Sequence, residues 1–115
     1  MPTISIDYDG TFTTDPEAWG KAIDILRQAG FRVICITSRF PNVPVSPHLF
    51  PGEVHYACGA NKWDFAHENG IEVDIWIDDW PAQVGEHPER RGHEWGQLTQ
   101  RRQMISQIFK QLKFA

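Results

Sequence analysis

The sequence TISIDYDGT, residues 3–11, combines a short apolar strand with two acidic residues and a turn. Ile4 and Ile6 alternate with polar residues, as they do in a strand, and an Asp-Gly pair then breaks the pattern. The strand should therefore deliver Asp7 and Asp9 side by side at its carboxyl end. Two carboxylates held so close repel each other unless a positive charge lies between them, and a divalent cation is the usual solution.

A second apolar run, IWIDD at residues 75–79, also ends in paired carboxylates. Asp-Gly turns after strands are common, so the first stretch alone indicates little more than a turn. One ion-binding site that draws on both strand ends explains both acidic pairs, whereas two unrelated acidic turns require a coincidence. The sequence therefore predicts that the two strands are neighbours around a metal site.

Composition indicates a single globular domain. The chain has 115 residues, 41% hydrophobic and 23% charged, which is enough to bury a core without disulfides. It has no long uncharged apolar run and no signal peptide ahead of Asp7, so we expect a cytoplasmic protein with no membrane partner. Cys35 and Cys58 lie in strand-like segments, which favours two buried thiols over a disulfide or a metal pair.

The net charge of −4 is unevenly distributed. Residues 1–80 carry 12 acidic and 5 basic residues, a net −7, whereas residues 81–115 carry 3 acidic and 6 basic residues, a net +3. An acidic crevice with a basic tail lacks the strong basic face of a nucleic-acid binder, so nucleic acid is not indicated as a partner. The basic tail could still attract an anionic substrate.

The first half of the chain reads as a strand–helix–strand unit. Asp15, followed by proline, is a typical helix start, and Gly30 ends the apolar periodicity of that helix. Residues 31–36 are a nearly continuous apolar run, as expected for a strand buried on both faces of a sheet. The spacing predicts two parallel strands joined by a right-handed crossover.

The remaining elements continue the alternation of strands and helices, which predicts an α/β layer fold whose ligands gather beyond the carboxyl ends of the strands. In chain order we expect a proline-rich loop (38–53), a strand (54–58), a helix (61–69), a strand (71–77), a polar loop (81–92) and an amphipathic helix (97–113). The domain is thus a core of residues 1–84 followed by a polar loop and a terminal helix in residues 85–115.

The side chains at these strand ends are of the types that phosphoryl transfer requires. A carboxylate can attack phosphorus, a hard cation offsets charge, and a hydroxyl with an ammonium holds the phosphate oxygens. The residues concerned are Asp7, Asp9, Thr37, Ser38, Lys62, Asp78 and Asp79.

These motifs, in this order and spacing, resemble the haloacid dehalogenase-like (HAD) superfamily of phosphohydrolases. The resemblance rests on DYDGT at 7–11, ITSR at 36–39, Lys62 on a helix and IDD at 77–79, and it covers roughly residues 3–84. It implies a Rossmann-like three-layer sandwich with a mainly parallel sheet in which the fourth strand lies beside the first. It also implies a Mg²⁺-dependent phosphatase.

The resemblance assigns a role to each acidic residue. Asp7 would be the phosphoryl acceptor, and Asp9 would be the general acid/base and would supply a backbone carbonyl to Mg²⁺. Asp78 would complete the metal shell with Asp7 and Asp9. Asp79 would act through a water or would position Lys62.

The phosphate-binding residues also follow from the resemblance. Thr37, with Ser38 and Gly10, would bind the phosphate, and Lys62 would orient the nucleophile and the phosphate. The residues themselves leave plainer readings open: Thr37 could merely cap a turn, and Lys62 could be a surface lysine. Asp79 could be the N-cap of a helix that begins at Pro81.

The chain departs from the family pattern in having no cap domain. Only residues 12–14 separate the first motif from the first helix, the segment before Lys62 is short, and a proline-rich loop replaces a helix after the second strand. An open site of this kind suggests a bulky phosphorylated substrate or coverage by another subunit of a homo-oligomer. Arg39 is a candidate anion contact, and Trp80 is a candidate for the pocket mouth.

Other functions remain as alternatives to a phosphatase. A phosphotransferase would use the same aspartyl-phosphate intermediate, and an inactive descendant would keep only metal or phosphate binding. A signalling receiver domain also groups acids, a hydroxyl and a lysine around Mg²⁺, but it carries its phosphorylated aspartate on the third strand, and residues 54–58 contain none. His87 and His93 could suggest zinc, but no cysteine is near them and a solvated loop is favoured.

Overall fold

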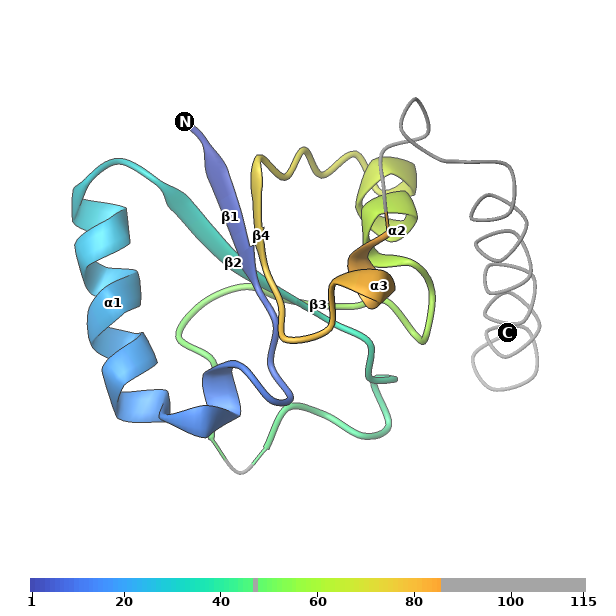
Figure 1. Cartoon of the computed structure of the whole chain (residues 1–115), viewed down its shortest axis with the longest axis horizontal. Helices are drawn as coiled ribbons and strands as arrows, with labels where there is room; N and C mark the ends of the chain where they lie inside the picture. Colours follow the sequence, from blue (N-terminus) through green and yellow to red (C-terminus); the bar gives the residue numbers. More distant parts are fainter. Residues whose placement is uncertain (47, 86–115) are drawn as a thin grey trace.

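The computed structural model describes residues 1–46 and 48–85, which form a parallel sheet with helices packed against it (Figure 1). The sheet order is β3-β2-β1-β4, and each adjacent pair is parallel. The strands are β1 (Thr3–Ile6), β2 (Arg32–Thr37), β3 (Val54–Tyr56) and β4 (Ile75–Ile77). The helical segments are η1 (Phe12–Thr14), α1 (Pro16–Gln28), α2 (Lys62–Glu68) and α3 (Pro81–Val84). The expected α/β fold with parallel strands is confirmed, and so is the place of the fourth strand beside the first.

Helix α1 begins and ends where its sequence signals predict. The Asp15 carboxylate accepts a hydrogen bond from the backbone N–H of Ala18 at 3.1 Å, and Pro16 occupies the first turn. At the other end Gly30 has a φ of +96° and donates its N–H to Arg27. That conformation favours glycine, so the helix stops and the chain turns into β2.

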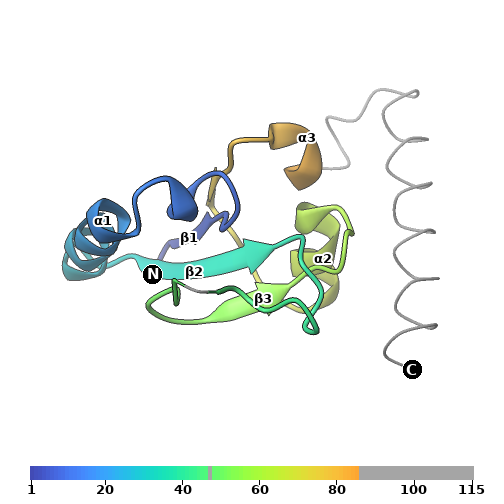
Figure 2. The same cartoon turned by 90° about the horizontal axis from the view of Figure 1, so that it is seen from below.

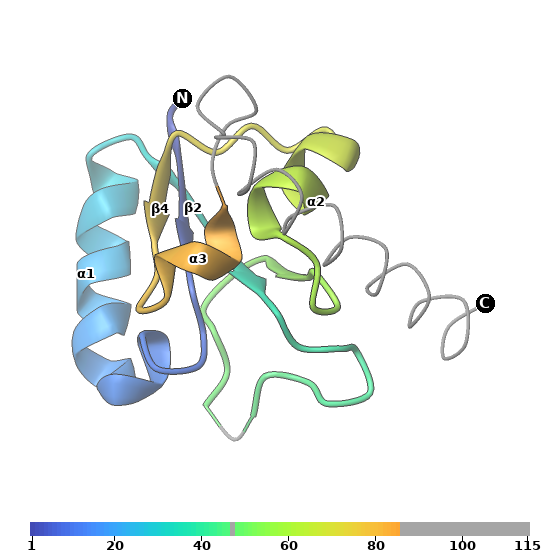
Figure 3. The same ribbon diagram turned by 45° about the vertical axis from the view of Figure 1, so that its right-hand side comes forward.

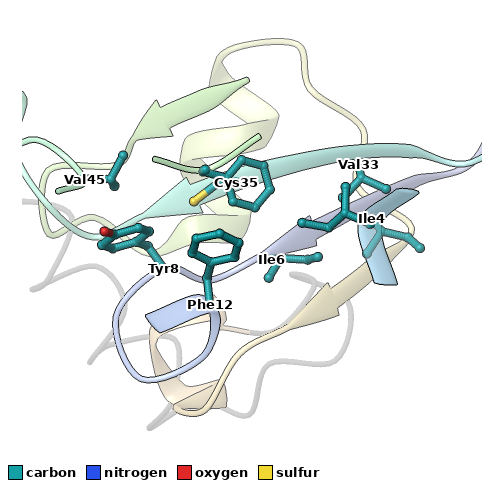
Figure 4. Packing of buried hydrophobic residues seen from close by; sticks show 9 residues of the cluster. Ile4, Ile6, Tyr8, Phe12, Val33, Cys35 and Val45 are labelled. Atoms are coloured by element: carbon teal, nitrogen blue, oxygen red, sulfur yellow. The ribbon is translucent and has the colours of Figure 1, made fainter. Parts of the chain in front are cut away.

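The residues of β2 alternate between two core clusters on opposite faces of the sheet. Val33 and Cys35 pack in the cluster that includes Ile23 of α1 and also contains Tyr8 and Phe12 (Figure 4). The other two apolar residues, Ile34 and Ile36, pack with residues of α2. Figure 2 shows α1 and α2 on either side of the strands. The unbroken apolar run of β2 is thus explained by burial on both faces.

Two strands are shorter than the sequence predicts. Strand β3 ends at Tyr56, and β4 includes only the last part of the expected segment 71–77. Just before β4, Asp74 makes two hydrogen bonds with the backbone of Thr3. Its carboxylate accepts from the Thr3 N–H at 2.8 Å, and its own N–H donates to the Thr3 carbonyl at 2.9 Å. Ile71 and Val73 pack against the α2 side of the core without joining the ladder.

The proline-rich segment is an ordered loop, as expected, in the part that the structure describes. Val45 and Phe50 are buried in the core cluster on the α1 side. The Tyr8 hydroxyl donates a hydrogen bond to the carbonyl of His48 at 2.7 Å, and the Tyr56 hydroxyl accepts one from the Val45 N–H at 3.3 Å. These contacts hold the loop over the ends of β1 and β3.

Both cysteines are buried thiols outside any disulfide, as predicted. Burial raises the pKa of Cys35 to about 12, which keeps that thiol protonated. Among residues 1–46 and 48–85, each helix is too short or too polar to cross a bilayer. Residues 81–84, expected to belong to a loop, instead form α3. The rest of that loop beyond residue 85 and the expected helix 97–113 lie outside the described residues, and so do His87 and His93.

Candidate active site

The ends of β1 and β4 bring Asp7 and Asp78 together. Ile6 pairs with Ile77 in the ladder, and the backbone N–H of Asp7 donates to the Ile77 carbonyl at 2.9 Å. The next residue of each strand therefore emerges at the same edge of the sheet (Figure 1). This is the adjacency that two acidic strand ends sharing one site require.

Lys62 lies between these two carboxylates. Its Nζ is 2.7 Å from Oδ1 of Asp7 and 2.5 Å from Oδ2 of Asp78, and its side chain is 1% exposed. The residue begins α2, where the Asn61 side chain caps the helix by accepting from the Asp64 N–H. The surface-lysine reading is therefore wrong, because a buried ammonium with two carboxylate partners is a structural part of the site.

A third carboxylate, that of Asp79, completes the group. One oxygen each from Asp7, Asp78 and Asp79 lie within 4.8 Å of one another, close enough to hold a metal ion. Three carboxylates against the single ammonium of Lys62 leave a formal charge of −2, which a divalent cation offsets. Carboxylate oxygens are also the ligands that hard cations prefer. The donor set therefore fits Mg²⁺, although it does not by itself identify the ion.

Gly10 makes room for Asp79. A Cβ at position 10 would lie 2.4 Å from Oδ2 of Asp79, and the φ of Gly10 is +80°. Both the contact and the conformation favour glycine here. The Gly10 N–H donates to the Thr13 hydroxyl at 3.0 Å. The structure thus shows a role for Gly10 in the approach of the two loops, beside the phosphate contact that the resemblance implies.

The pKa of Asp7 is raised to about 6, chiefly because its carboxyl group is buried. The Lys62 ammonium opposes this shift, whereas the neighbouring carboxyl groups of Asp79 and Asp78 reinforce it. The Thr11 hydroxyl donates a weak hydrogen bond to Oδ2 of Asp7 at 3.3 Å. At neutral pH the carboxylate is mainly charged, so it can serve as a ligand and as a nucleophile.

Asp9 lies apart from the three grouped carboxylates and pairs with Arg39. Nε and an Nη of Arg39 donate to the two Asp9 oxygens, each at 2.7 Å. Arg39 is itself fixed, because it lies 5.0 Å from the centre of the Tyr8 ring and donates to the Pro44 carbonyl at 2.7 Å. The anion contact expected of Arg39 is thus, in this structure, the Asp9 side chain.

Thr37 ends β2 and Ser38 follows it at the same edge of the sheet. The buried Thr37 hydroxyl accepts from the Arg39 N–H at 3.2 Å, which is the turn-capping contact that was the plainer reading. The Ser38 hydroxyl donates to the side-chain oxygen of Gln83 at 3.0 Å and so connects this turn to α3. Ser38 lines the pocket described next, whereas Thr37 is not among its lining residues.

A pocket of about 330 Å³ opens above the carboxylates. It combines acidic, basic, amide and aromatic side chains from the ends of β1, β2 and β4 and from α3. The lining residues are Asp7, Asp9, Ser38, Arg39, Asp79, Trp80 and Gln83. Asp79 is not the cap of α3, because Trp80 occupies the N-cap position without a side-chain bond. Trp80 at the mouth agrees with the sequence expectation.

Gln83 had not been singled out from the sequence, and only its nearness to Asp79 along the chain could have drawn attention to it. The partnership of Arg39 with Asp9 was also not foreseen. No protein-family model, curated protein or solved structure matches this chain in the three comparisons made. The function is therefore argued from the residues of the site.

Proposed function

We propose that the protein is a Mg²⁺-dependent phosphomonoester hydrolase of the HAD-like type that works through an aspartyl-phosphate on Asp7. The observation that carries the proposal is the buried Lys62 ammonium between Asp7 and Asp78, with Asp79 close by. This arrangement unites residues from three separate motifs of the HAD-like pattern. A bound Mg²⁺ would be held by these carboxylates and would neutralise charge on the phosphoryl oxygens.

The geometry favours one oxygen of Asp7 as the nucleophile. Lys62 binds Oδ1, which leaves Oδ2, the oxygen near Thr11, to attack phosphorus. As the new P–O bond forms, the ester P–O bond breaks and the leaving oxygen takes a proton from Asp9, which takes that proton up from solvent once it has left Arg39. A water then attacks the aspartyl-phosphate, Asp9 accepts the proton of that water, and inorganic phosphate leaves with Asp7 restored.

Asp9 must turn away from Arg39 to perform these proton transfers. Its side chain is 55% exposed and lines the pocket, so the movement needs no rearrangement of the core. An incoming phosphate gives the Arg39 guanidinium an alternative anionic partner in the same pocket. Substrate binding would then release the general acid/base as it positions the phosphate.

The test is hydrolysis of a generic aryl phosphate by the full chain with Mg²⁺ or with EDTA. We expect turnover only with the metal, and we expect Asp7→Asn to reduce it to background because the attacking charge is removed. Asp24→Asn, an exposed change on α1, is the matched control and should retain activity. Turnover by Asp7→Asn close to that of the wild type would overturn the covalent mechanism.

The same experiment separates hydrolysis from phosphoryl transfer. Adding an alcohol acceptor and identifying the products shows whether water or the alcohol receives the phosphoryl group. A chain that binds Mg²⁺ and phosphate but turns over no ester would support the binding-protein alternative instead.

A further inference from the structure

A second hollow adjoins the candidate active site. It has a volume of about 200 Å³ and is lined by Gly59, Ala60, Asn61, Trp80 and Gln83. The last two of these residues also line the pocket above the carboxylates. The two hollows therefore share one wall, which α3 and the residue before it supply beside α2 (Figure 3).

Trp80 is the aromatic part of this shared wall. Single exposed apolar residues are common on proteins, so its 54% exposure alone indicates nothing. Its position is informative, because its backbone N–H donates to Oδ1 of Asp78 at 2.8 Å. The backbone of Trp80 is thus tethered to a carboxylate of the site, and the residue borders both hollows.

The rest of the lining of the second hollow comes from Gly59, Ala60 and Asn61. Gly59 has a φ of +77°, and no atom lies within 4 Å of the place where a Cβ would stand. The Asn61 side chain is fixed by its cap on α2 and by close packing against Gly85. An apolar cavity of about 150 Å³ is enough to bind benzene. The hollow therefore has room for one planar ring.

Gln83 gives the shared wall a polar edge. Its side-chain oxygen accepts from Ser38, so the amide nitrogen remains as a donor on the same residue. A flat aromatic surface beside an oriented amide is a combination that suits a planar ring with polar atoms on its edge.

We propose that this hollow is the leaving-group subsite and that the substrates are phosphomonoesters whose leaving group carries an aromatic or heteroaromatic ring. The ring stacks on Trp80 while the phosphoryl group lies over Asp7. This proposal rests on the proposed function for the place of the phosphoryl group, and it adds the class of molecule to which that group is attached.

The test compares two non-hydrolysable ligands, benzylphosphonate and cyclohexylmethylphosphonate, by calorimetry on the full chain with Mg²⁺. They match in charge and size but differ in planarity. We expect wild-type protein to bind the benzyl compound about three- to tenfold more tightly, the range of an aromatic stacking contact. Trp80→Leu should abolish that preference, whereas Trp80→Phe should retain most of it.

Equal affinity of wild-type protein for the two phosphonates would overturn the subsite without recourse to any variant. A preference that survives in Trp80→Leu would also overturn it, because the stacking residue would then be another. Failure of both ligands to bind at all would instead count against the phosphate site and hence the proposed function. Turnover of aryl phosphates and of nucleoside monophosphates can then be compared. The comparison shows whether the subsite accepts a simple aromatic ring or a nucleobase as part of the leaving group.

Discussion

The floor and the rim of the candidate active site use the same kind of charge pair in opposite settings. On the floor, Lys62 and its partners Asp7 and Asp78 have side chains that are at most 6% exposed. On the rim, the Arg39–Asp9 pair has side chains that are 23% and 55% exposed. Burial strengthens electrostatic interactions and makes unpaired charges costly, whereas water weakens both effects. The floor is therefore coupled to stability, whereas the side chains of the rim can change partners at little cost in stability.

Lys62→Met tests the floor and should give the largest effect on stability. The change leaves two buried carboxylates without their cation, and removing one partner of a buried pair typically costs about 3–5 kcal/mol. The matched control is Lys21→Met, because Lys21 pairs with Glu17 on the exposed surface of α1, where loss should stay within about 0.5 kcal/mol. Urea unfolding of the metal-free proteins measures the loss of stability in both variants. Equal unfolding midpoints for Lys62→Met and Lys21→Met would contradict the contrast between buried and exposed pairs.

Asp9→Asn tests the rim and should separate activity from stability. We expect kcat to fall by about 10²–10⁴-fold, since an amide cannot transfer the proton that general acid/base catalysis requires. The free energy of unfolding should change by less than about 1 kcal/mol, because the pair with Arg39 is partly exposed. Steady-state kinetics and urea unfolding on the same preparation provide the two numbers. A variant that loses stability but keeps its kcat would reverse the roles assigned to the two regions.

The pH dependence of stability tests the burial of Asp7 on the floor of the site, and the expected effect is smaller than those above. The pKa of Asp7 in the folded protein, about 6, lies above its ordinary value of 3.8, so the folded state binds this proton more tightly. The metal-free protein should therefore gain stability from this group as pH falls from about 6 toward 4, by at most about 3 kcal/mol. Lys62, Asp78 and Asp79 face the group and contribute to the same shift.

Asp7→Asn is the reference for that measurement, because the difference between the two proteins removes contributions from other groups. Glu53 is one such group, since Arg32 and His55 lower its pKa and its stabilisation is lost in acid. Without metal, the unfolding midpoint of the wild type should rise relative to that of Asp7→Asn as the pH is lowered from 7 to 6 and then to 5. Excess Mg²⁺ should suppress the gain by competing with the proton, and a gain unaffected by Mg²⁺ would argue against a metal at Asp7.

The local signals in the sequence were sufficient for the framework of the fold. Capping by Asp15 and the turn at Gly30 bounded α1, and the apolar run of β2 indicated a strand covered on both faces. The pairing of β1 with β4 followed from a different argument, that two acidic strand ends share one ion. The length of β4 could not be predicted, because the hydrogen bonds of Asp74 to Thr3 depend on tertiary contact.

The site was predicted less completely than the fold. Spacing alone singled out Lys62, and only the structure shows its burial between two carboxylates. The bond between Arg39 and Asp9 joins residues 30 positions apart, and a pattern read along one strand carries no information about it. Gln83 lies on a four-residue helix whose direction is set by packing, so its place in the pocket had no signal in the sequence.

The close approach of Gly10 to Asp79 has a consequence for how this chain can change over generations. A side chain at position 10 would collide with the Asp79 carboxylate as it now lies, so position 10 cannot gain one unless the Asp79 side chain moves or is lost. A lineage that keeps the third carboxylate must keep the glycine. One that loses the Asp79 carboxylate removes this collision, but the φ of +80° still favours glycine at position 10, so position 79 should be the first of the two to vary.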